Sequence, residues 1–315
     1  MRYFITLSYD GTRYHGWQVQ PNGISVQGEL QRALSLLLRQ EIQVTGAGRT
    51  DTGVHARKMV AHFEVPAPTG VSCPSDPRNS PNGSDCQSEP FGLPVRAVRT
   101  GMEPRPDIPS SPSPVGDTPD TCPNPVPLLA NLTQLAYKLN RLLPCDIAIQ
   151  KIEPVADDLH ARFSATSRTY RYYVHTGKQP FLRHYSLQLH YDLDFGLMNE
   201  AAALLLGYDD FGAFCKSHAD VKTTLCHVTH AQWHQTSDTE WYFEITANRF
   251  LRNMVRAVVG TLVDVGRRRL TLDDFRKVIE GKKRTEAGES MPANALFLEE
   301  IKYEATDLRG GKGEN

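Results

Sequence analysis

The segment Gly46–Ala56 reads GAGRTDTGVHA and places a guanidinium, a hydroxyl and a carboxylate on the consecutive residues Arg49, Thr50 and Asp51. A carboxylate beside a guanidinium stays ionised well below neutral pH, so it can act as a nucleophile or base without first losing a proton. The three glycines of the segment allow tight turns and a close approach of a bound partner to the backbone. A structural role is also open, because an Asp at a loop corner commonly accepts backbone N–H bonds in an Asx-turn.

The nonapeptide Gly48–Ala56 resembles the signature of the tRNA pseudouridine synthase A (TruA) family, which is usually written GRTDAGVHA. Thr52 stands where Ala is usual, and its hydroxyl could alter the hydrogen bonding beside the carboxylate. The resemblance extends over residues 1–65 and about 128–304. It implies isomerisation of uridine to pseudouridine in the anticodon arm of tRNA, classically at positions 38 to 40, with neither a cofactor nor a metal.

The resemblance also implies roles for single residues. Asp51 matches the family nucleophile, which attacks either ring carbon 6 of uracil or the anomeric carbon of the ribose. Arg49 matches the arginine that fills the space left by a flipped base or contacts its phosphate. Tyr170 matches the position whose ring stacks on the uracil, although a tyrosine here also suits a strand core. Arg256 matches the arginine that pairs with the carboxylate, and Leu296 the residue that packs under the base.

Several further arginines could contact phosphate, namely Arg162, Arg168 and Arg252. The first two belong to the segments HARFSAT and RTYRY, which also resemble family motifs. Arg252 recurs at helical spacing with Arg249 and Arg256, so we expect these three side chains on one face of a helix. A stripe of this kind is usually solvated surface, whereas in an anion-binding cleft it would bind phosphates.

The periodicity of the first half predicts a β-α-β-β-α-β order. The predicted strands are Arg2–Tyr9, Ile42–Val44, Lys58–Val65 and Asp146–Ile152, and the predicted helices run from the Ser25 cap to about Arg39 and over about Leu128–Leu143. In the loop Thr12–Asn22, Trp17 either contacts a nucleotide or anchors the loop on the core.

A looser repeat of this pattern follows. Its predicted strands are Tyr170–His175, Val228–Gln235, Trp241–Ala247 and Leu296–Tyr303, and its predicted helices are Leu197–Leu206, Phe250–Val265 and Thr271–Glu280. The fold class is therefore α+β, with two ferredoxin-like (RRM-like) α/β halves that form a mixed antiparallel sheet around a central cleft. Residues 1–65 and 128–152 would form the N-terminal half with the catalytic loop, and residues 153–304 the C-terminal half.

Residues 66–127 differ in kind, because they hold 16 of the 21 prolines and show neither helical nor strand periodicity. Such a composition cannot bury enough apolar surface to offset chain entropy, so we predict a disordered insert. Residues 305–315 are predicted to be a disordered tail.

The charge balance bears on partners and location. A formal net charge of −1 argues weakly against nucleic acid, but outside residues 66–127 the chain holds 31 bases against 29 acids. An RNA surface therefore requires local clustering of arginines. The sequence has no apolar run of the roughly 20 residues that a membrane helix needs, and its N-terminus lacks a secretory signal. We expect a cytoplasmic protein without membrane contact, and the resemblance implies a homodimer in which one tRNA touches both subunits.

Two alternatives stay open. The loosely zinc-like spacing of Cys215, His218, Cys226 and His230 suggests a zinc-dependent base-modifying enzyme, although these segments suit ordinary core positions. The second alternative is a non-catalytic RNA-binding module of the same fold, which would not need Asp51 in an intact GRTD loop. The sequence contains neither a phosphate loop nor a dinucleotide fingerprint, and we expect no cofactor and no metal.

Overall fold

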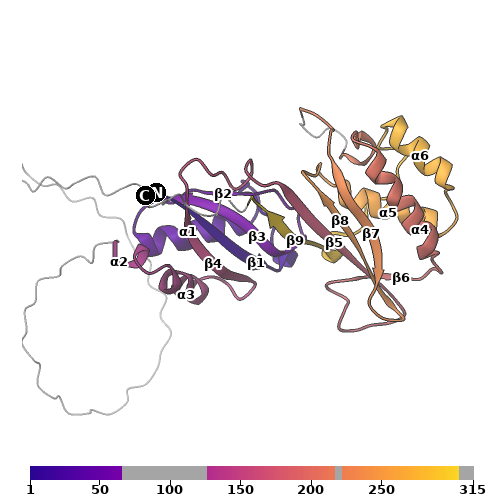
Figure 1. Ribbon diagram of the computed structural model, residues 1–315. Helices are drawn as coiled ribbons and strands as arrows, with labels where there is room; N and C mark the ends of the chain where they lie inside the picture. Colours follow the sequence, from indigo (N-terminus) through magenta and orange to yellow (C-terminus); the bar gives the residue numbers. More distant parts are fainter. Residues whose placement is uncertain (66–125, 217–221, 305–315) are drawn as a thin grey trace, which may run out of the picture. The chain divides into compact units, whose positions relative to one another are not determined.

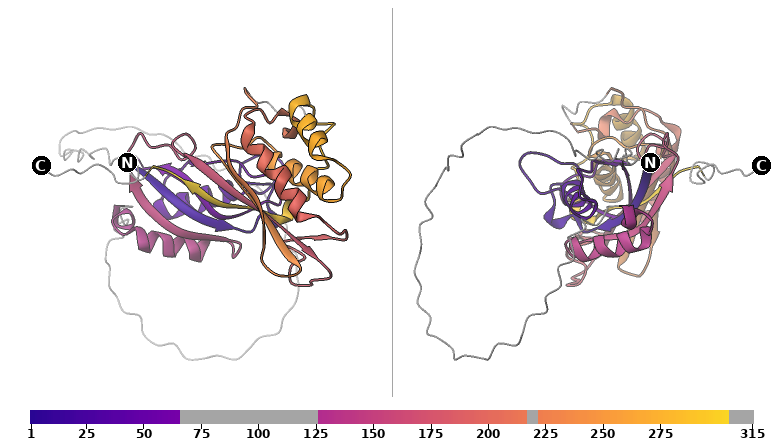
Figure 2. Two further views of the ribbon diagram at one scale, coloured as in Figure 1. Left: turned by 45° about the vertical axis from the view of Figure 1, so that its right-hand side comes forward. Right: turned by 90° about the vertical axis from the view of Figure 1, so that its left-hand side faces the viewer.

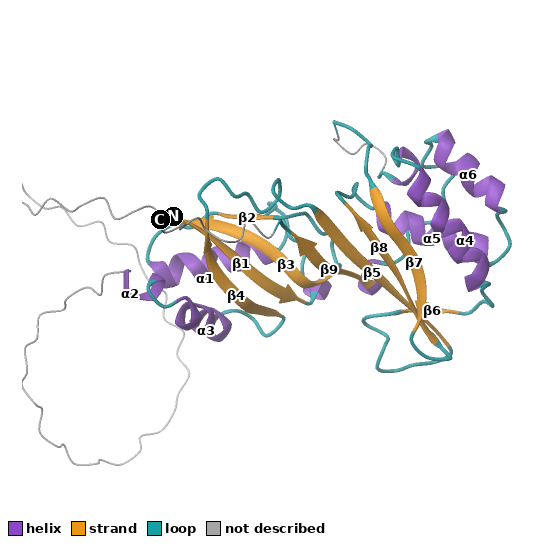
Figure 3. Ribbon diagram, viewed as in Figure 1, coloured by secondary structure: helices purple, strands orange, loops and turns teal. Residues whose placement is uncertain are grey.

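A computed structural model of the chain describes residues 1–65, 126–216 and 222–304. The predicted insert and tail lie outside the described residues, apart from the last two residues of the insert. Within the described part, no helix is long and apolar enough to cross a membrane. The described part combines helices with a mostly antiparallel sheet, which confirms the α+β class (Figure 3).

The elements of the first half are β1 (Arg2–Tyr9), α1 (Val26–Leu38), β2 (Val44–Gly46), β3 (His55–Glu64), α2 (Val126–Leu129), α3 (Leu132–Leu142) and β4 (Ile147–Val155). Those of the second half are β5 (Ser167–Thr176), β6 (Leu187–Leu189), α4 (Phe195–Leu204), β7 (Val228–Gln235), β8 (Glu240–Ala247), α5 (Met254–Gly266), α6 (Leu272–Gly281) and β9 (Leu296–Lys302). β1 and β7 have the predicted bounds, and most other predicted elements are present with shifted ends.

The nine strands form one mixed sheet in the order β4-β1-β3-β9-β5-β8-β7, with β2 paired to β3 and β6 paired to β5 (Figure 1). All pairs are antiparallel except β3–β9 and β5–β6. The two halves repeat one order, since β4-β1-β3-β2 in the first corresponds to β9-β5-β8-β7 in the second. They join where His55 and Ala56 pair with Phe297 and Leu298, so the glycine-rich loop Gly46–Ala56 ends at this join.

Local sequence explains most helix ends. Ser25 caps α1 by accepting a hydrogen bond from the backbone N–H of Gly28, and Arg39 ends the helix in a left-handed conformation. The single helix predicted over Leu128–Leu143 is wrong, because the chain forms α2 and α3 with Asn131 as the N-cap of α3. An Asn side chain that accepts a hydrogen bond from a backbone N–H favours a new helix start over a continuous helix.

The start of α5 also differs from the prediction. Asn253 adopts a left-handed φ of 69°, and α5 begins at Met254 rather than at Phe250. Arg249 and Arg252 therefore lie in the loop before α5, and the expectation that they share a helical face with Arg256 is wrong. Asn tolerates this conformation better than most residues because its short side chain bonds locally.

The described residues form two apolar cores. One gathers residues of α4, α5 and α6 with β5, β7 and β8, and the other gathers residues of α1 and α3 with β1, β3 and β4. The turned views show each set of helices against its own part of the sheet (Figure 2). Val54 belongs to the first core and Ala56 to the second, while Tyr170 packs against both. The end of the glycine-rich loop is thus tied to both halves.

Helix α5 approaches the following loop closely at Gly260. A Cβ atom at this position would lie 1.8 Å from the carbonyl oxygen of Glu289, which is backbone and cannot rotate away. Met291, two residues further on, accepts a hydrogen bond from the Arg256 side chain. The missing side chain at Gly260 therefore sets where this loop meets the arginine.

We predict that Gly260→Ala lowers the free energy of unfolding by about 1–3 kcal/mol, because the added methyl group must displace the backbone. Urea denaturation measures this change. Gly207→Ala is the matched control, since a Cβ at Gly207 would meet nothing within 4 Å. If the two variants unfold alike, the close approach does not constrain the fold.

Candidate active site

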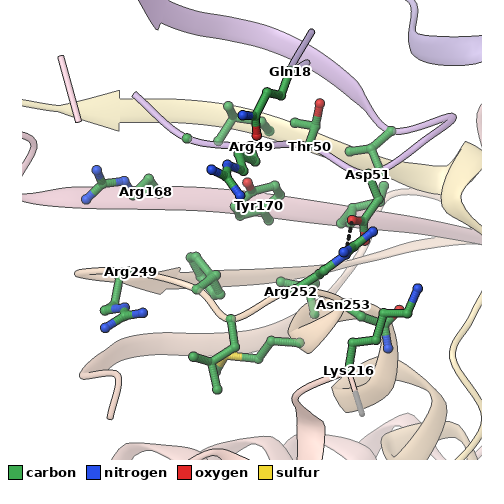
Figure 4. Close-up of a pocket in the computed structure, with 18 of the residues that line it drawn as sticks. Gln18, Arg49, Thr50, Asp51, Arg168, Tyr170, Lys216, Arg249, Arg252 and Asn253 are labelled. Atoms are coloured by element: carbon green, nitrogen blue, oxygen red, sulfur yellow. Dashed lines mark ion pairs between the residues drawn. The ribbon is translucent and has the colours of Figure 1, made fainter. Parts of the chain in front are cut away.

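A cleft of about 1430 Å³ lies where the two halves join, and its lining comes from residues of both. Nine of the described lining residues are Arg or Lys, whereas Asp51 is the one acid among them. Figure 4 shows the side chains of the glycine-rich loop facing those of the loop before α5, with Arg168 and Tyr170 of β5 between them. The clustering of arginines that an RNA surface requires is present here.

The Asp51 carboxylate is partly exposed, at 28%, and lies between two guanidinium groups. Its Oδ1 is 3.6 Å from Nε of Arg252, and its Oδ2 is 3.9 Å from a terminal nitrogen of Arg256. Figure 4 draws the first of these pairs as a dashed line. At such distances the contacts are ion pairs rather than hydrogen bonds, so the oxygens face the cleft with acceptor capacity to spare.

The backbone around Asp51 is fixed by the preceding residue. Thr50 is buried, its hydroxyl shares a 2.9 Å hydrogen bond with the hydroxyl of Tyr9, and its carbonyl accepts a hydrogen bond from the backbone N–H of Trp17. Gly16 has a φ of +91°, and a Cβ there would lie 2.2 Å from the carbonyl oxygen of Thr50. Trp17 is only 2% exposed, so it anchors the loop on the core rather than contacting a nucleotide.

The turn after Asp51 is closed by backbone groups. The Val54 N–H donates to the Asp51 carbonyl at 3.1 Å, and Gly53 supplies the positive φ of +77° that the turn requires. The side chain of Asp51 points instead toward the arginines (Figure 4). This arrangement favours the functional interpretation of Asp51 over the Asx-turn.

His55 holds the far end of the loop. Its Nδ1 accepts a hydrogen bond from the Gly11 N–H, and its Nε2 donates to the Asn294 carbonyl, each at 3.0 Å. Burial lowers the pKa of His55, although the nearby Asp10 carboxylate opposes that shift. His55 therefore links the β1 end, the glycine-rich loop and the turn before β9, a role that the sequence did not reveal.

Arg256 is held by backbone as well as by charge. Its Nε donates to the Met291 carbonyl, and the Met291 N–H donates back to the Arg256 carbonyl at 3.1 Å. Arg284, which the sequence analysis missed, supports the same loop through the carbonyls of Ala287 and Gly288. No spacing along the chain links Arg284 to Arg256, so only the folded loop shows the connection.

The apolar side of the cleft comes from β5 and β9. Tyr170 meets the ring of Phe250 edge to face, with centroids 5.0 Å apart. Burial raises the pKa of Tyr170 to about 12, so it is a neutral phenol at physiological pH. Leu296 is 6% exposed and lines the cleft beside it. Both residues line the same cleft as Asp51.

Arg168 differs from the expectation of a phosphate ligand. Its guanidinium donates to four backbone carbonyls, those of Ala47, Arg162, Ala165 and Asn248, at 2.6–3.1 Å. Burial lowers its pKa. These bonds occupy its terminal nitrogens and tie β5 to the start of the glycine-rich loop and to the loop before α5. Arg168 therefore positions the walls of the cleft.

Arg49 and Arg162 line the cleft with exposed side chains. Lys216 and Asn253, which the sequence analysis did not single out, line it as well. Lys216 is the last described residue before residues 217–221. Its backbone N–H donates to the Arg252 carbonyl at 3.0 Å, which holds it beside the loop before α5. Tertiary contact, rather than a motif, brings it to the site.

The zinc alternative finds little support. Cys215 and Cys226 are buried thiols of the first core, and His218 lies outside the described residues. His230 is grouped instead with His234 and Glu244, and across residues 1–65, 126–216 and 222–304 this is the one cluster with metal-ligand geometry.

Comparisons with known proteins identify the family of this chain. The sequence model of a family described as tRNA pseudouridine synthase matches residues 201–304. The chain is 46% identical to the tRNA pseudouridine synthase A of Bacteroides fragilis over 302 residues, which cover 96% of each chain. It is 33% identical to the tRNA pseudouridine synthase A of Bacillus subtilis over 308 residues, which cover 96% of this chain and all of the relative. The chain thus falls among the pseudouridine synthases, which are isomerases. Within that class it belongs to the tRNA pseudouridine synthase A family.

We predict that Arg168→Lys lowers the free energy of unfolding by about 2–4 kcal/mol, because one ammonium cannot reproduce hydrogen bonds from a planar guanidinium to four carbonyls. Thermal and urea unfolding measure the loss. Arg32→Lys is the control, since Arg32 is exposed and pairs with Glu29 on the surface of α1. Equal stability of both variants would show that the carbonyl contacts of Arg168 contribute little.

Proposed function

We propose that this protein converts uridine to pseudouridine in the anticodon stem-loop of tRNA, at positions 38 to 40, with Asp51 as the nucleophile. The observation that supports this most directly is the Asp51 carboxylate, held between Arg252 and Arg256 in a cleft of otherwise cationic charge. A binding module would gain from the cations but would lose affinity for phosphate through the carboxylate.

The cleft suits a polyanion. Its nine Arg and Lys side chains lie in a protein whose formal net charge is only −1, so positive charge is concentrated here. Such a concentration attracts phosphate groups and steers their approach. Arg49, Arg162 and Arg252 have exposed guanidinium groups and are the proposed phosphate contacts, with Arg49 also able to occupy the space of a displaced base.

A uridine in a duplex must leave its stack to reach Asp51, which costs about a few kcal/mol. We infer that Tyr170 and Leu296 supply the apolar surface for the flipped base, because both line the cleft near the carboxylate. An aromatic platform contributes roughly 1–3 kcal/mol per base. Phe163, which is 78% exposed and also lines the cleft, is available to stack on a neighbouring nucleotide.

The reaction conserves all atoms. The bond between the anomeric carbon and N1 breaks, the uracil turns, a bond from the anomeric carbon to C5 forms, and the C5 proton is lost while N1 gains one. Asp51 can begin it by adding to ring carbon 6 or to the anomeric carbon. In either route the guanidinium groups of Arg252 and Arg256 stabilise the carboxylate when it is released.

We propose further features that rest on the family. The halves, residues 1–65 with 128–152 and residues 153–304, are ferredoxin-like, as their repeated strand order supports. The protein acts in the cytoplasm, where its proposed tRNA substrate is processed. It works as a homodimer in which one tRNA touches both subunits.

Asp51→Asn is expected to retain tRNA binding and to lose pseudouridine formation by at least about 1,000-fold, in the range seen when a covalent nucleophile is removed. Pseudouridine mapping of tRNA incubated with purified protein measures activity, and a filter-binding titration measures affinity. Asp273→Asn is the control, because Asp273 is an exposed carboxylate of α6 that pairs with Arg276.

Normal modification by the Asp51 variant would end the assignment of the nucleophile. Tight tRNA binding by the unaltered protein without any pseudouridine would instead favour the non-catalytic RNA-binding module.

Sedimentation velocity at micromolar concentration is expected to show a dimer, because one tRNA must contact two subunits in the proposed complex. A single monomeric species, both with and without tRNA, would contradict the proposed assembly and leave the catalytic assignment untouched.

A further inference from the structure

Two histidines and a glutamate converge on the face of β7 and β8 that points away from the helices. Side chains alternate along a strand, and Ala231 and Trp233 of β7 are buried in the core with α4–α6. His230 and His234 therefore lie on the opposite face of β7. Glu244 alternates in the same way with the buried Phe243 and Ile245 of β8. None of the three converging residues lines the cleft.

The convergence is unusual for these positions. Residues four apart in a strand have Cα atoms about 13 Å apart, so their side chains usually do not meet. Here the candidate ligand atoms of all three residues lie within 4.8 Å of one another, and Nε2 of His230 is 3.6 Å from Oε1 of Glu244. Around a tetrahedral zinc ion with bonds of about 2.0–2.2 Å, ligand atoms lie about 3.4 Å apart. Only small side-chain movements would therefore bring the three ligand atoms to the spacing that a zinc ion needs.

The histidine nitrogens also lack partners within the described residues. Nε2 of His230 and Nε2 of His234 are both buried from solvent without a hydrogen bond. A buried polar atom without a partner costs about 1–3 kcal/mol, and native proteins rarely retain one. If Nε2 of His230 carried a proton, it could pair with the Glu244 carboxylate, but Nε2 of His234 would still lack a partner. One cation between the three residues would give Nε2 of His230 a partner and would take a ring nitrogen of His234 as a second ligand.

Neighbouring groups hold the three side chains in place. Nε of Arg171 donates to Oε2 of Glu244 at 2.6 Å, which leaves Oε1 turned toward the imidazoles. The ring of His234 stacks on Tyr242, with centroids 4.9 Å apart. Supporting contacts of this kind orient the ligands of metal sites.

We propose that His230, His234 and Glu244 form a structural binding site for a divalent transition-metal ion, with Zn²⁺ as the best match, that links β7 to β8. Two imidazoles and one carboxylate suit Zn²⁺, Co²⁺ or Ni²⁺ and disfavour Mg²⁺ and Ca²⁺, which prefer oxygen ligands alone. The fourth coordination position is left to water. The site is separate from the cleft and makes no contribution to the isomerisation.

The test is metal binding by the full chain, prepared without a histidine tag and freed of metal by chelator. Titration calorimetry with Zn²⁺ should show one ion per chain, and Co²⁺ should give the visible absorption of a tetrahedral site. His234→Gln should weaken binding by at least about 100-fold, because a direct ligand matters more than the supporting groups whose loss costs about 10–100-fold. His230→Gln should do the same, while His227→Gln, which alters an exposed histidine beside Asp209, should leave binding unchanged.

Thermal unfolding is a second measure. Zn²⁺ should raise the melting temperature of the unaltered protein and of His227→Gln but not of either ligand variant, since only a native site stabilises by binding. Absence of saturable binding in the folded protein would overturn the proposal. The proposal would also fail if both ligand variants bound Zn²⁺ as tightly as the unaltered protein, because other surface histidines would then hold the ion. Neither result bears on pseudouridine formation.

Discussion

The functional site depends on one ion-paired carboxylate in a cleft whose other charges are positive. Asp51 lies within 4 Å of two guanidinium groups. Several arginines of the cleft are fixed through neutral backbone carbonyls rather than through carboxylates. Arg168 binds four carbonyls, Arg256 binds that of Met291, and Arg284 binds those of Ala287 and Gly288. A carbonyl orients a guanidinium without cancelling its charge, so the cleft keeps a positive potential for phosphate although the whole chain is nearly neutral.

The join between the two halves explains how that carboxylate is placed. The glycine-rich loop ends where β3 pairs in parallel with β9, and its last residues belong to different cores. Tyr170 contacts both cores from the neighbouring strand β5. A carboxylate on an isolated loop would sample many positions, whereas a loop anchored on two packed halves loses that freedom on folding. The position of Asp51 is therefore set by the fold before any ligand binds.

The family signature is largely a structural motif. Of its nine residues, Asp51 faces the arginines and Arg49 is exposed to the cleft. Thr50 and His55 are buried and hydrogen-bonded to other segments. Thr52, the one departure from the usual pattern, is exposed on the cleft, so its hydroxyl disturbs no packing. The motif is therefore long because several of its residues are needed to hold one carboxylate.

The sequence by itself determined the local features of this protein. The period of apolar residues predicted β1 and β7 to the residue, and Ser25 marked the start of α1. The resemblance of Gly48–Ala56 pointed to the family that the comparisons then established. These inferences succeeded because periodicity, capping and motif chemistry act between residues that are close in the chain.

Tertiary structure decided the rest. It made Trp17 an anchor, turned Arg168 from an expected phosphate ligand into a brace for the cleft walls, and placed Arg249 and Arg252 in a loop. It also brought His234 and Glu244 to His230. Each of these outcomes depends on burial or on contact between segments far apart in sequence. Neither residue type nor local spacing specifies the partners that a folded chain brings together.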